Sequence, residues 1–412
     1  MKIIHFSWEF PPTIVGGLGT FTTELTRQLI IQGHEVLLFT LNRGDLPTTD
    51  NWKGVEVHRP KIVDFSDIYR IFADDELKKW GEGLRFFSDV VTYNMLSASK
   101  LINQIVNDRK FDLVDAHDWL GITGGIVAKE RLGVPLVFHM HSTEKGRSMG
   151  KGSRTIEDFE YLGGQMADRV ITVSYAMMEH LTTLGFERDK IRVIWNGVDP
   201  SKYNPHRIKE EGKKALRRRY GITDEDVMLL FVGRLTGVKG VINLVKAIAS
   251  LKEHSELKLV ILGVGELDVE IKNLIKDLEL EERVKLRTEF VDEEERILNY
   301  AASDLVILPS FYEPFGIVCT EAMSMAKPVV VGARGISGFK EQVIPDGDKQ
   351  CGVHINPHDP EDIAWGIKQV IESEDRGEWM GVNGRDRVLE NFSWEVISRE
   401  TIKTYRELIE EC

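Results

Sequence analysis

Two glutamates, Glu313 and Glu321, lie eight residues apart in the segment Glu-Pro-Phe-Gly-Ile-Val-Cys-Thr-Glu, between two apolar runs. A carboxylate can accept hydrogen bonds from sugar hydroxyls or from a ribose diol. We expect a helix from Gly316 to Met325, whose first N–H groups have no partner in the helix and favour an anion. Solvent exposure is the ordinary explanation for two glutamates. The Glu-Pro-Phe-Gly context at a strand end favours a binding site instead.

Two cations lie five residues apart in a second glycine-containing segment. Arg234 and Lys239 belong to Gly-Arg-Leu-Thr-Gly-Val-Lys-Gly, directly after the apolar run 228–232. This arrangement suits a diphosphate whose negative charge grows as a bond to it breaks, because a preorganised charge in a dry site stabilises such a transition state. The alternative is a surface loop with ordinary solvated cations.

The N-terminal half contains a glycine turn, Gly16-Gly17-Leu-Gly-Thr, after the first apolar run. Glycines there would let backbone N–H groups of Gly16 and Gly17 approach a phosphate at a helix N-terminus. The spacing matches neither the dinucleotide fingerprint nor a P-loop, which weakens both of those interpretations. A plain structural connection remains the alternative.

Three polar side chains follow other predicted strands of this half. Asp118 follows the strand at 113–116, His141 follows the strand at 136–140, and Asn196 follows the strand at 192–195. A histidine at a strand end is often a satisfied structural group; we expect this for His139 and a functional role for His141. For Asn196, the Asn-Gly pair also suits a tight turn.

Short apolar runs alternate with amphipathic segments, which predicts strands alternating with helices. Strands are expected at 3–6, 35–40, 113–116, 136–140, 170–173 and 192–195, and again at 228–232, 258–262, 284–286, 305–308 and 328–331. Such alternation predicts α/β architecture with parallel sheets covered on both faces. We expect two Rossmann-like, doubly wound domains: residues 1–205, completed by a C-terminal helix at 395–412, and residues 206–394. Ligands of such sheets bind at strand carboxyl ends, which predicts a site in the inter-domain cleft.

The overall composition restricts the possible partners. A formal net charge of −13 does not favour nucleic acid, and the basic run at 213–219 is expected to be a solvated helix or linker face. Three widely spaced cysteines indicate neither a disulfide framework nor a zinc site. The sequence shows no signal stretch and no transmembrane run, so we expect a cytoplasmic protein.

The ordered set of motifs at 16–20, 115–119, 139–147, 195–199, 233–240 and 313–321 resembles retaining glycosyltransferases of the GT-B type. More narrowly, it resembles the family of sucrose synthases, sucrose-phosphate synthases and related bacterial and archaeal transferases, with the glycogen and starch synthases close by. The resemblance covers essentially the whole chain. It implies that the nucleotide-sugar donor is bound by the C-terminal domain and that the N-terminal domain lies on the acceptor side.

The resemblance also implies a role for each matching residue. Arg234 and Lys239 would bind the donor diphosphate, Glu321 the nucleotide ribose, and Glu313 would lie beside the transferred sugar, where His141 would also make contact. The remaining matching residues would line the donor or acceptor pocket: Gly16, Gly17, Asp118, Asn196, Phe315, Gly316, Ile317 and Thr320. The lysine that ADP-glucose-dependent synthases carry shortly before Gly-Gly is replaced by Val15. The chain is also short for that group, which leaves little room for its acceptor-binding insertions. These two departures leave the donor base, UDP or ADP, and a glucan acceptor open.

The implied reaction is transfer of a hexosyl group from a nucleotide-diphosphate sugar to a sugar or glucan hydroxyl, with retention of configuration. Glucosyl is the hexosyl group that the resemblance favours. No metal and no cofactor besides the donor is expected, since the two cations and a helix N-terminus would replace a metal. The alternatives are a sucrose-synthase-like transferase with a small acceptor, a nucleotide-sugar epimerase, and a non-catalytic nucleotide-sugar binder. The sequence does not predict an oligomeric state.

Overall fold

The computed structural model describes residues 1–73, 75–80, 83–106 and 109–412. These residues form two compact units, an N-terminal unit made of Met1–Asn196 and Trp394–Cys412 and a C-terminal unit made of Gly197–Ser393. The first boundary therefore falls after Asn196, not at the predicted 205. The reason is that residues 197–205 bind to the C-terminal unit: the N–H of Val198 donates to Phe392 O (2.8 Å) and the hydroxyl of Tyr203 donates to Glu321 (2.8 Å).

The N-terminal unit is built on one eight-stranded sheet in the order β3-β4-β2-β1-β5-β6-β7-β8. All neighbouring pairs are parallel except β3 and β4. The strands are β1 (Lys2–Phe6), β2 (Glu35–Phe39), β3 (Thr49–Trp52), β4 (Val55–His58), β5 (Leu113–His117), β6 (Leu136–Met140), β7 (Arg169–Thr172) and β8 (Ile191–Val193).

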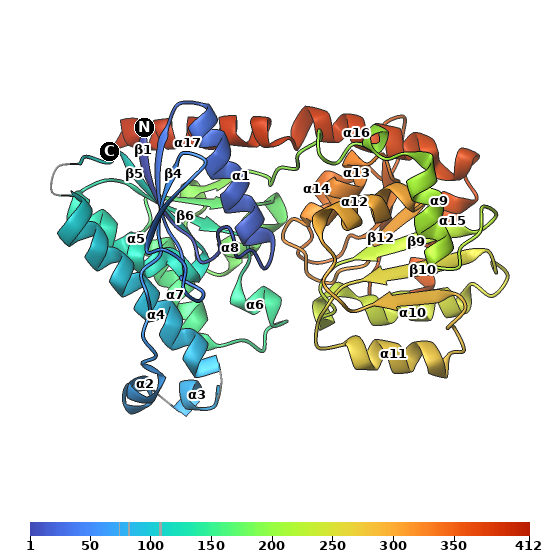
Figure 1. Ribbon diagram of the computed structural model, residues 1–412, viewed down its shortest axis with the longest axis horizontal. Coiled ribbons are helices and arrows are strands. Elements are labelled where there is room, and N and C mark those ends of the chain that lie inside the picture. The colour runs from blue at the N-terminus through green and yellow to red at the C-terminus, as the bar shows by residue number, and fades with distance from the viewer. Residues whose placement is uncertain (74, 81–82, 107–108) are drawn as a thin grey trace. The chain divides into compact units, whose positions relative to one another are not determined.

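Helices flank this sheet (Figure 1). They are α1 (Gly17–Ile31), α2 (Ser66–Phe72), α3 (Asp75–Lys78), α4 (Gly83–Lys100), α5 (Asp118–Leu132), α6 (Glu144–Arg147), α7 (Arg154–Met166), α8 (Tyr175–Thr183) and α17 (Trp394–Glu411), with short turns η1 (Leu101–Ile105) and η3 (Arg188–Lys190). The apolar face of α17, including Trp394, Ile397 and Tyr405, is buried in the same core as β1, β2 and α1. The last helix of the chain is therefore part of the N-terminal unit.

The C-terminal unit is built on a six-stranded, fully parallel sheet in the order β11-β10-β9-β12-β13-β14. The chain starts at β9, runs outward to β11, and then reverses through β12 to β14, which is the doubly wound order of a Rossmann-like domain. Its strands are β9 (Val227–Val232), β10 (Leu257–Leu262), β11 (Val284–Arg287), β12 (Leu305–Leu308), β13 (Val329–Gly332) and β14 (Gly352–Ile355).

The helices of this unit lie on both sides of its strands (Figure 1). They are α9 (Glu210–Arg219), α10 (Val241–Ser250), α11 (Asp268–Asp277), α12 (Glu293–Ala302), α13 (Ile317–Ser324), α14 (Phe339–Gln342), α15 (Pro360–Ile371) and α16 (Glu378–Asn391), with short turns η4 (Pro205–Arg207), η5 (Gly237–Lys239) and η6 (Glu374–Gly377). Apolar residues of the strands and of α10, α11 and α15 form its core. The basic run at 213–219 lies entirely on α9, where Arg217 pairs with Asp304 and Arg219 with Glu295.

Three strands were missing from the sequence prediction: β3, β4 and β14. β3 is the edge strand and reads Thr-Asp-Asn-Trp, with three exposed residues, so it has neither an apolar run nor high strand propensity. β14 contains Gly352 and His354, which interrupt the apolar pattern, yet its pairing with β13 fixes it as a strand. Among the described residues, no helix is both long and apolar enough to cross a membrane.

Candidate functional site

The first group of predicted residues meets in the C-terminal unit, at the carboxyl ends of the neighbouring strands β9 and β12. The loop after β9 carries Lys239 and the loop after β12 carries Glu313, and the Lys239 ammonium donates to Glu313 Oε2 in a short ion pair. The hydroxyl of Ser310 donates to the same oxygen at 3.1 Å. Because β9 and β12 are parallel neighbours, the sheet itself brings together two residues that lie far apart in the sequence.

Two glycines make this close approach possible. Gly240 adopts φ +70°, and a Cβ there would lie 2.0 Å from the carbonyl oxygen of Pro309. Gly316 adopts φ +91°, and a Cβ there would lie 2.4 Å from the ring of Phe339 and 2.9 Å from Glu313 Cγ. Both positions therefore require glycine for two reasons, the left-handed backbone and the lack of space.

Gly316 is the N-cap of α13, which runs from Ile317 to Ser324, so the predicted start at Gly316 is one residue early and the predicted end at Met325 is one residue late. The first N–H groups of α13, beginning with Ile317, have no acceptor inside the helix and form a place for an anion. The side chain of Phe315 is buried, and Thr320 donates its hydroxyl to the carbonyl of Ile317 at 2.9 Å. Thr320 is fully buried, so what this segment can offer a ligand is mainly its backbone.

Glu321, one turn into α13, is held in a buried network. Tyr203 donates to Oε1 at 2.8 Å, Arg296 donates to the same oxygen at 3.3 Å, and Tyr300 donates to Oε2 at 2.9 Å. The Arg296 guanidinium in turn donates to the Tyr203 hydroxyl at 2.7 Å. The predicted ribose ligand therefore already has three donors in this structure.

Removal of the Glu321 carboxylate should destabilise the C-terminal unit. Glu321→Leu removes the nearer acceptor of two buried tyrosine hydroxyls, leaving Tyr203 with Glu293 Oε1 at 3.1 Å and Tyr300 with Val318 O at 3.4 Å. It also removes the nearest carboxylate of Arg296. We expect a loss of about 3 kcal/mol in the free energy of unfolding, because breaking a buried charged pair is costly. Tyr203→Phe, which removes one donor only, should cost about 1 kcal/mol. Urea unfolding measures both, and equal losses in the two variants would contradict this account.

Arg234 differs from Lys239 in its surroundings. Its side chain is exposed, and among the described residues it makes no ion pair and no side-chain hydrogen bond. The loop around it is nevertheless ordered, since the N–H of Leu235 donates to Val264 O at 2.9 Å. Arg234 is thus a charge available to a ligand, whereas Lys239 is already neutralised by Glu313.

The second group of predicted residues lies in the N-terminal unit, at the carboxyl ends of β5 and β6. The N–H of His141 donates to Asp118 Oδ1 at 2.8 Å. Asp118 is the first residue of α5 and adopts φ +51°, an uncommon conformation for a residue other than glycine. Burial raises the pKa of Asp118, while the nearby Arg147 opposes that shift. Asp118 and His141 thus form one local unit.

Arg147, which was not singled out from the sequence, supports the loop after His141. Arg147 donates to Ser142 Oγ (2.5 Å) and to Glu144 Oε2 (3.1 Å), and lies 3.6 Å from Glu160 Oε1. Glu160 on α7 also accepts from the N–H of Glu144 at 2.8 Å. Burial raises the pKa of Glu160 to about 8, which the Arg147 charge opposes.

The glycine turn at the start of α1 has an occupant within the chain. Glu9 Oε2 accepts from the N–H groups of Val15 and Gly16, each at 3.0 Å. A Cβ at Gly19 would lie 2.9 Å from that same oxygen, so the glycine leaves room for the carboxylate. The Gly16 N–H predicted to approach a phosphate is therefore bonded to Glu9, and Gly17 begins α1.

Asn196, the last residue of the Met1–Asn196 segment of the N-terminal unit, is buried. Its Oδ1 has no hydrogen-bond partner among the described residues. An amide oxygen in this state can accept a hydrogen bond from a ligand.

Behind His141 lies a buried polar cluster that the sequence reasoning did not predict: His5, Asp115, His117 and His139, all fully buried. The cluster is made by strand register, since β5 lies between β1 and β6, with His5 opposite Asp115 and His117 opposite His139. The only signal in the sequence was the histidines at the ends of two predicted strands, and the order of the strands was needed to join them.

This cluster should make the N-terminal unit sensitive to acid. Burial lowers the pKa of His5 to about 4 and that of His117 to about 3, from 6.5. The unfolded chain binds these protons below pH 6.5 and the folded chain does not, so the stabilisation is complete above pH 6.5 and is lost as the pH falls towards 4. At pH 4.5 each histidine should remove about 2–3 kcal/mol. Urea unfolding at pH 7 and 4.5 tests this, and His5→Asn should show the smaller difference.

Both halves of the chain match families of known proteins. Residues 15–202 match the family described as Glycosyltransferase Family 4, and residues 212–387 match Glycosyl transferases group 1. The chain is 34% identical over 412 residues to an uncharacterized glycosyltransferase of Methanocaldococcus jannaschii, covering 98% of each. It is 30% identical over 420 residues to a glycogen synthase of Mycobacterium tuberculosis, covering 98% of this chain and 94% of the relative.

A solved structure with the same fold is that of sucrose-phosphate synthase from Thermosynechococcus elongatus, with a TM-score of 0.82 and 21% identity over the whole of both chains. At this level of identity the likeness shows the fold alone.

Proposed function

The chain belongs to the glycosyltransferase group 1 and family 4 enzymes and has the GT-B fold, and from this premise we propose that it transfers a glucosyl group from a nucleotide-diphosphate glucose to a sugar or glucan hydroxyl, with retention of configuration. The observation that carries the proposal is the Lys239–Glu313 pair at the start of α13. The relative named glycogen synthase supports glucose as the transferred sugar and a glucan as an acceptor.

In this proposal the C-terminal unit binds the donor. Lys239, Arg234 and the first N–H groups of α13 stabilise the diphosphate as it leaves. Glu313 accepts hydrogen bonds from hydroxyls of the transferred sugar, and Glu321 accepts from the ribose through the lone pairs that its three donors leave. The Phe315–Gly316–Ile317 backbone provides donors, and Thr320 supports that backbone through its bond to Ile317 O.

The N-terminal unit is assigned the reacting sugar and the acceptor. His141 contacts the sugar, Asp118 holds the His141 backbone in place at 2.8 Å, and Asn196 offers its unpartnered Oδ1. Because Glu9 already bonds to the Gly16 N–H, Gly16 and Gly17 are assigned to shaping the acceptor side and not to a second phosphate.

Retention is proposed to arise without a covalent intermediate. Glu313 is bonded to Lys239 and Ser310, and a carboxylate held in this way is a poor nucleophile. The acceptor would attack on the face from which the diphosphate leaves, and the leaving phosphate oxygen would take the acceptor proton. The C–O bond to phosphate breaks, the new C–O bond forms, and the proton ends on the nucleoside diphosphate.

The proposed charge stabilisation by Lys239 and Arg234 predicts activity without a metal ion. Transfer measured after dialysis against EDTA should keep more than about half its rate, since two cations and a helix N-terminus supply the positive potential. Loss of all activity in EDTA, restored by magnesium or manganese, would contradict this part of the proposal.

The donor and acceptor can be identified by the release of nucleoside diphosphate. UDP-, ADP- and GDP-glucose would each be offered with glucose, fructose, phosphorylated hexoses and glycogen. Acceptor-dependent release from one donor supports transfer. Conversion of the donor sugar without any acceptor would support an epimerase instead, and tight donor binding with no release from any pair would support a non-catalytic binder.

A further inference from the structure

Three histidine rings of the N-terminal unit, those of His5, His117 and His141, form a hydrogen-bonded series. His5 Nδ1 lies 3.2 Å from His117 Nε2, and His117 Nδ1 lies 3.2 Å from His141 Nε2. The rings are nearly parallel, with interplanar angles of 16° and 18°. His5 and His117 are fully buried, whereas His141 is partly exposed. The series therefore runs from the core of the sheet to the surface where His141 ends it.

The protonation of these rings restricts the direction of their hydrogen bonds. Burial lowers the pKa of His5 and of His117 to about 4 and about 3, and that of His141 well below its ordinary value, so all three are neutral at pH 7. A neutral imidazole has one N–H and one bare nitrogen. His117 must therefore donate to one neighbour and accept from the other, which leaves two possible directions for the whole series.

The inner end of the series decides between them. His5 Nε2 is buried and has no hydrogen-bond partner among the described residues. If His5 donates from Nδ1, only a bare nitrogen is left there; in the opposite direction a buried N–H is left without an acceptor. Orphaned buried N–H groups are rare because they lose a bond to water and gain none. The favoured direction is from His5 to His117 to His141, so that His141 accepts at Nε2 and carries its proton on Nδ1.

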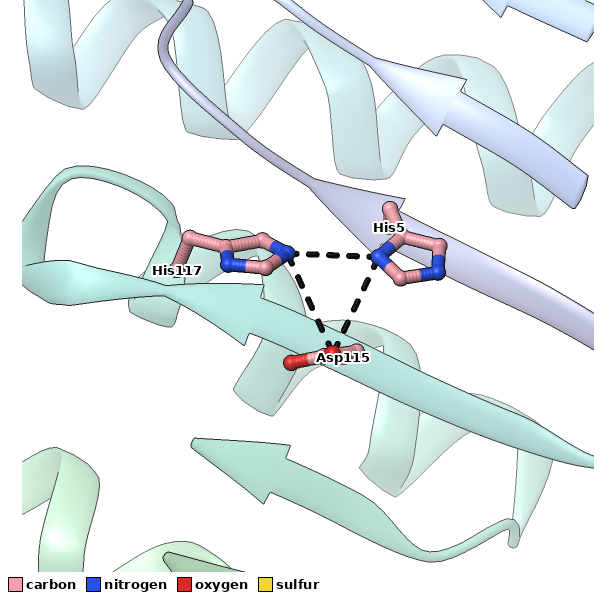
Figure 2. A group of neighbouring side chains, drawn as sticks. All are labelled: His5, Asp115 and His117. Atoms are coloured by element: carbon pink, nitrogen blue, oxygen red, sulfur yellow. Dashed lines mark hydrogen bonds and ion pairs between the residues drawn. The ribbon is translucent and has the colours of Figure 1, made fainter. Parts of the chain in front are cut away.

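A metal ion is the competing explanation for this cluster. His5 Nδ1, His117 Nε2 and Asp115 Oδ2 are separated by 3.2, 3.8 and 3.9 Å (Figure 2), a spacing that a tetrahedral ion could bridge. An ion on His5 Nδ1 would place the proton on Nε2, but metal-bound histidines normally donate that N–H to a partner, and none is present among the described residues. Asp115 Oδ2 also already accepts from Tyr405 and lies 3.5 Å from His139 Nδ1.

We propose that His5 and His117 act as positioning residues that fix His141 as a neutral Nδ1–H donor to a hydroxyl oxygen of the transferred sugar. This inference rests on the proposed function and adds a chemical requirement to it: the sugar must present an acceptor oxygen to His141. The relay itself is independent of that function, because it follows from bonds within the N-terminal unit.

The relay is tested by nitrogen-15 NMR on the whole protein with labelled histidine, using His141→Gln to assign the resonances. Long-range proton–nitrogen correlations distinguish the two tautomers. We expect His141 at pH 7 with a protonated Nδ1 and a bare Nε2. A His141 ring that carries its proton on Nε2, or that is charged at pH 7, overturns the relay. So does a stoichiometric transition metal in the purified protein.

The role in transfer is tested with two variants of similar shape, His117→Asn and His117→Leu. Asparagine retains an N–H near the position of Nδ1, so the tautomer should persist and kcat/KM should stay within about threefold. Leucine removes the donor; His141 should then show mixed tautomers, and kcat/KM should fall about tenfold, the effect of one hydrogen bond. Equal kcat/KM in both variants, with the expected tautomer in the wild type, overturns the role in transfer. That result would leave the proposed reaction intact, because Lys239 and Glu313 test it separately.

Discussion

Replacement of Lys239 by methionine should lower kcat/KM by about 10²- to 10³-fold, the effect of losing a preorganised charge at the leaving group. The loss has two causes. The diphosphate loses a cation, and Glu313, 8% exposed and bonded to Lys239 in the wild type, becomes an unpaired carboxylate beside the phosphate. Steady-state kinetics with the identified donor measure this, and isothermal titration with the nucleoside diphosphate measures the loss of affinity.

A double variant separates these causes, and a lysine elsewhere in the unit provides the control. The double variant Lys239→Met/Glu313→Gln should bind nucleoside diphosphate more tightly than Lys239→Met, because it removes the repulsive carboxylate as well. Lys252→Met, an exposed lysine of the same unit, should behave as the wild type. A double variant that binds nucleoside diphosphate no more tightly than Lys239→Met would show that the Glu313 carboxylate does not repel the bound phosphates.

Replacement of Glu313 by glutamine should lower kcat by about 10²-fold while leaving nucleoside diphosphate affinity unchanged or improved. Glutamine keeps the shape of the side chain and an oxygen that can accept from Ser310. It loses the negative charge that accepts from the sugar and that neutralises Lys239. Lys239 is thereby freed for the phosphates, so catalysis and product binding should change in opposite directions.

The matched control for this change is Glu253→Gln, an exposed glutamate of the C-terminal unit, which should leave kcat and affinity unaltered. If Glu313→Gln weakens nucleotide binding and leaves kcat intact, Glu313 would act on the nucleotide and not on the transferred sugar.

Much of the fold follows from short-range patterns in the sequence. Apolar runs such as 228–232 and 259–262 are buried on both faces of a parallel sheet, which explains why they read as hydrophobic segments and why the strands at 228–232 and 258–262 were predicted within one residue. The edge strand Thr49–Trp52 has no such pattern, because only its pairing with β4 defines it. The boundary after Asn196 also depends on long-range bonds, such as that of Tyr203 to Glu321, which no local pattern contains.

The sequence selected candidate residues but did not show the contacts among them. Strand-end positions, motif context and the family resemblance made Lys239, Glu313, Asp118 and His141 candidates. They did not show that Lys239 and Glu313 pair with each other, or that Glu321 is enclosed by Tyr203, Tyr300 and Arg296. Such contacts depend on strand order and loop conformation. The relay behind His141 was missed for the same reason, since β1, β5 and β6 had to be placed side by side.

The most direct test of the central claim is proton NMR of the product formed from the nucleotide-diphosphate glucose and acceptor identified by the release assay. The donor carries its glucose in the α configuration. We predict that the first glycosidic product to appear has a new bond at the acceptor hydroxyl, also in the α configuration, and that Lys239→Met and Glu313→Gln form it far more slowly. A β-linked first product would contradict the proposed retention, and glucose released to water with no glycosidic product would contradict transfer itself.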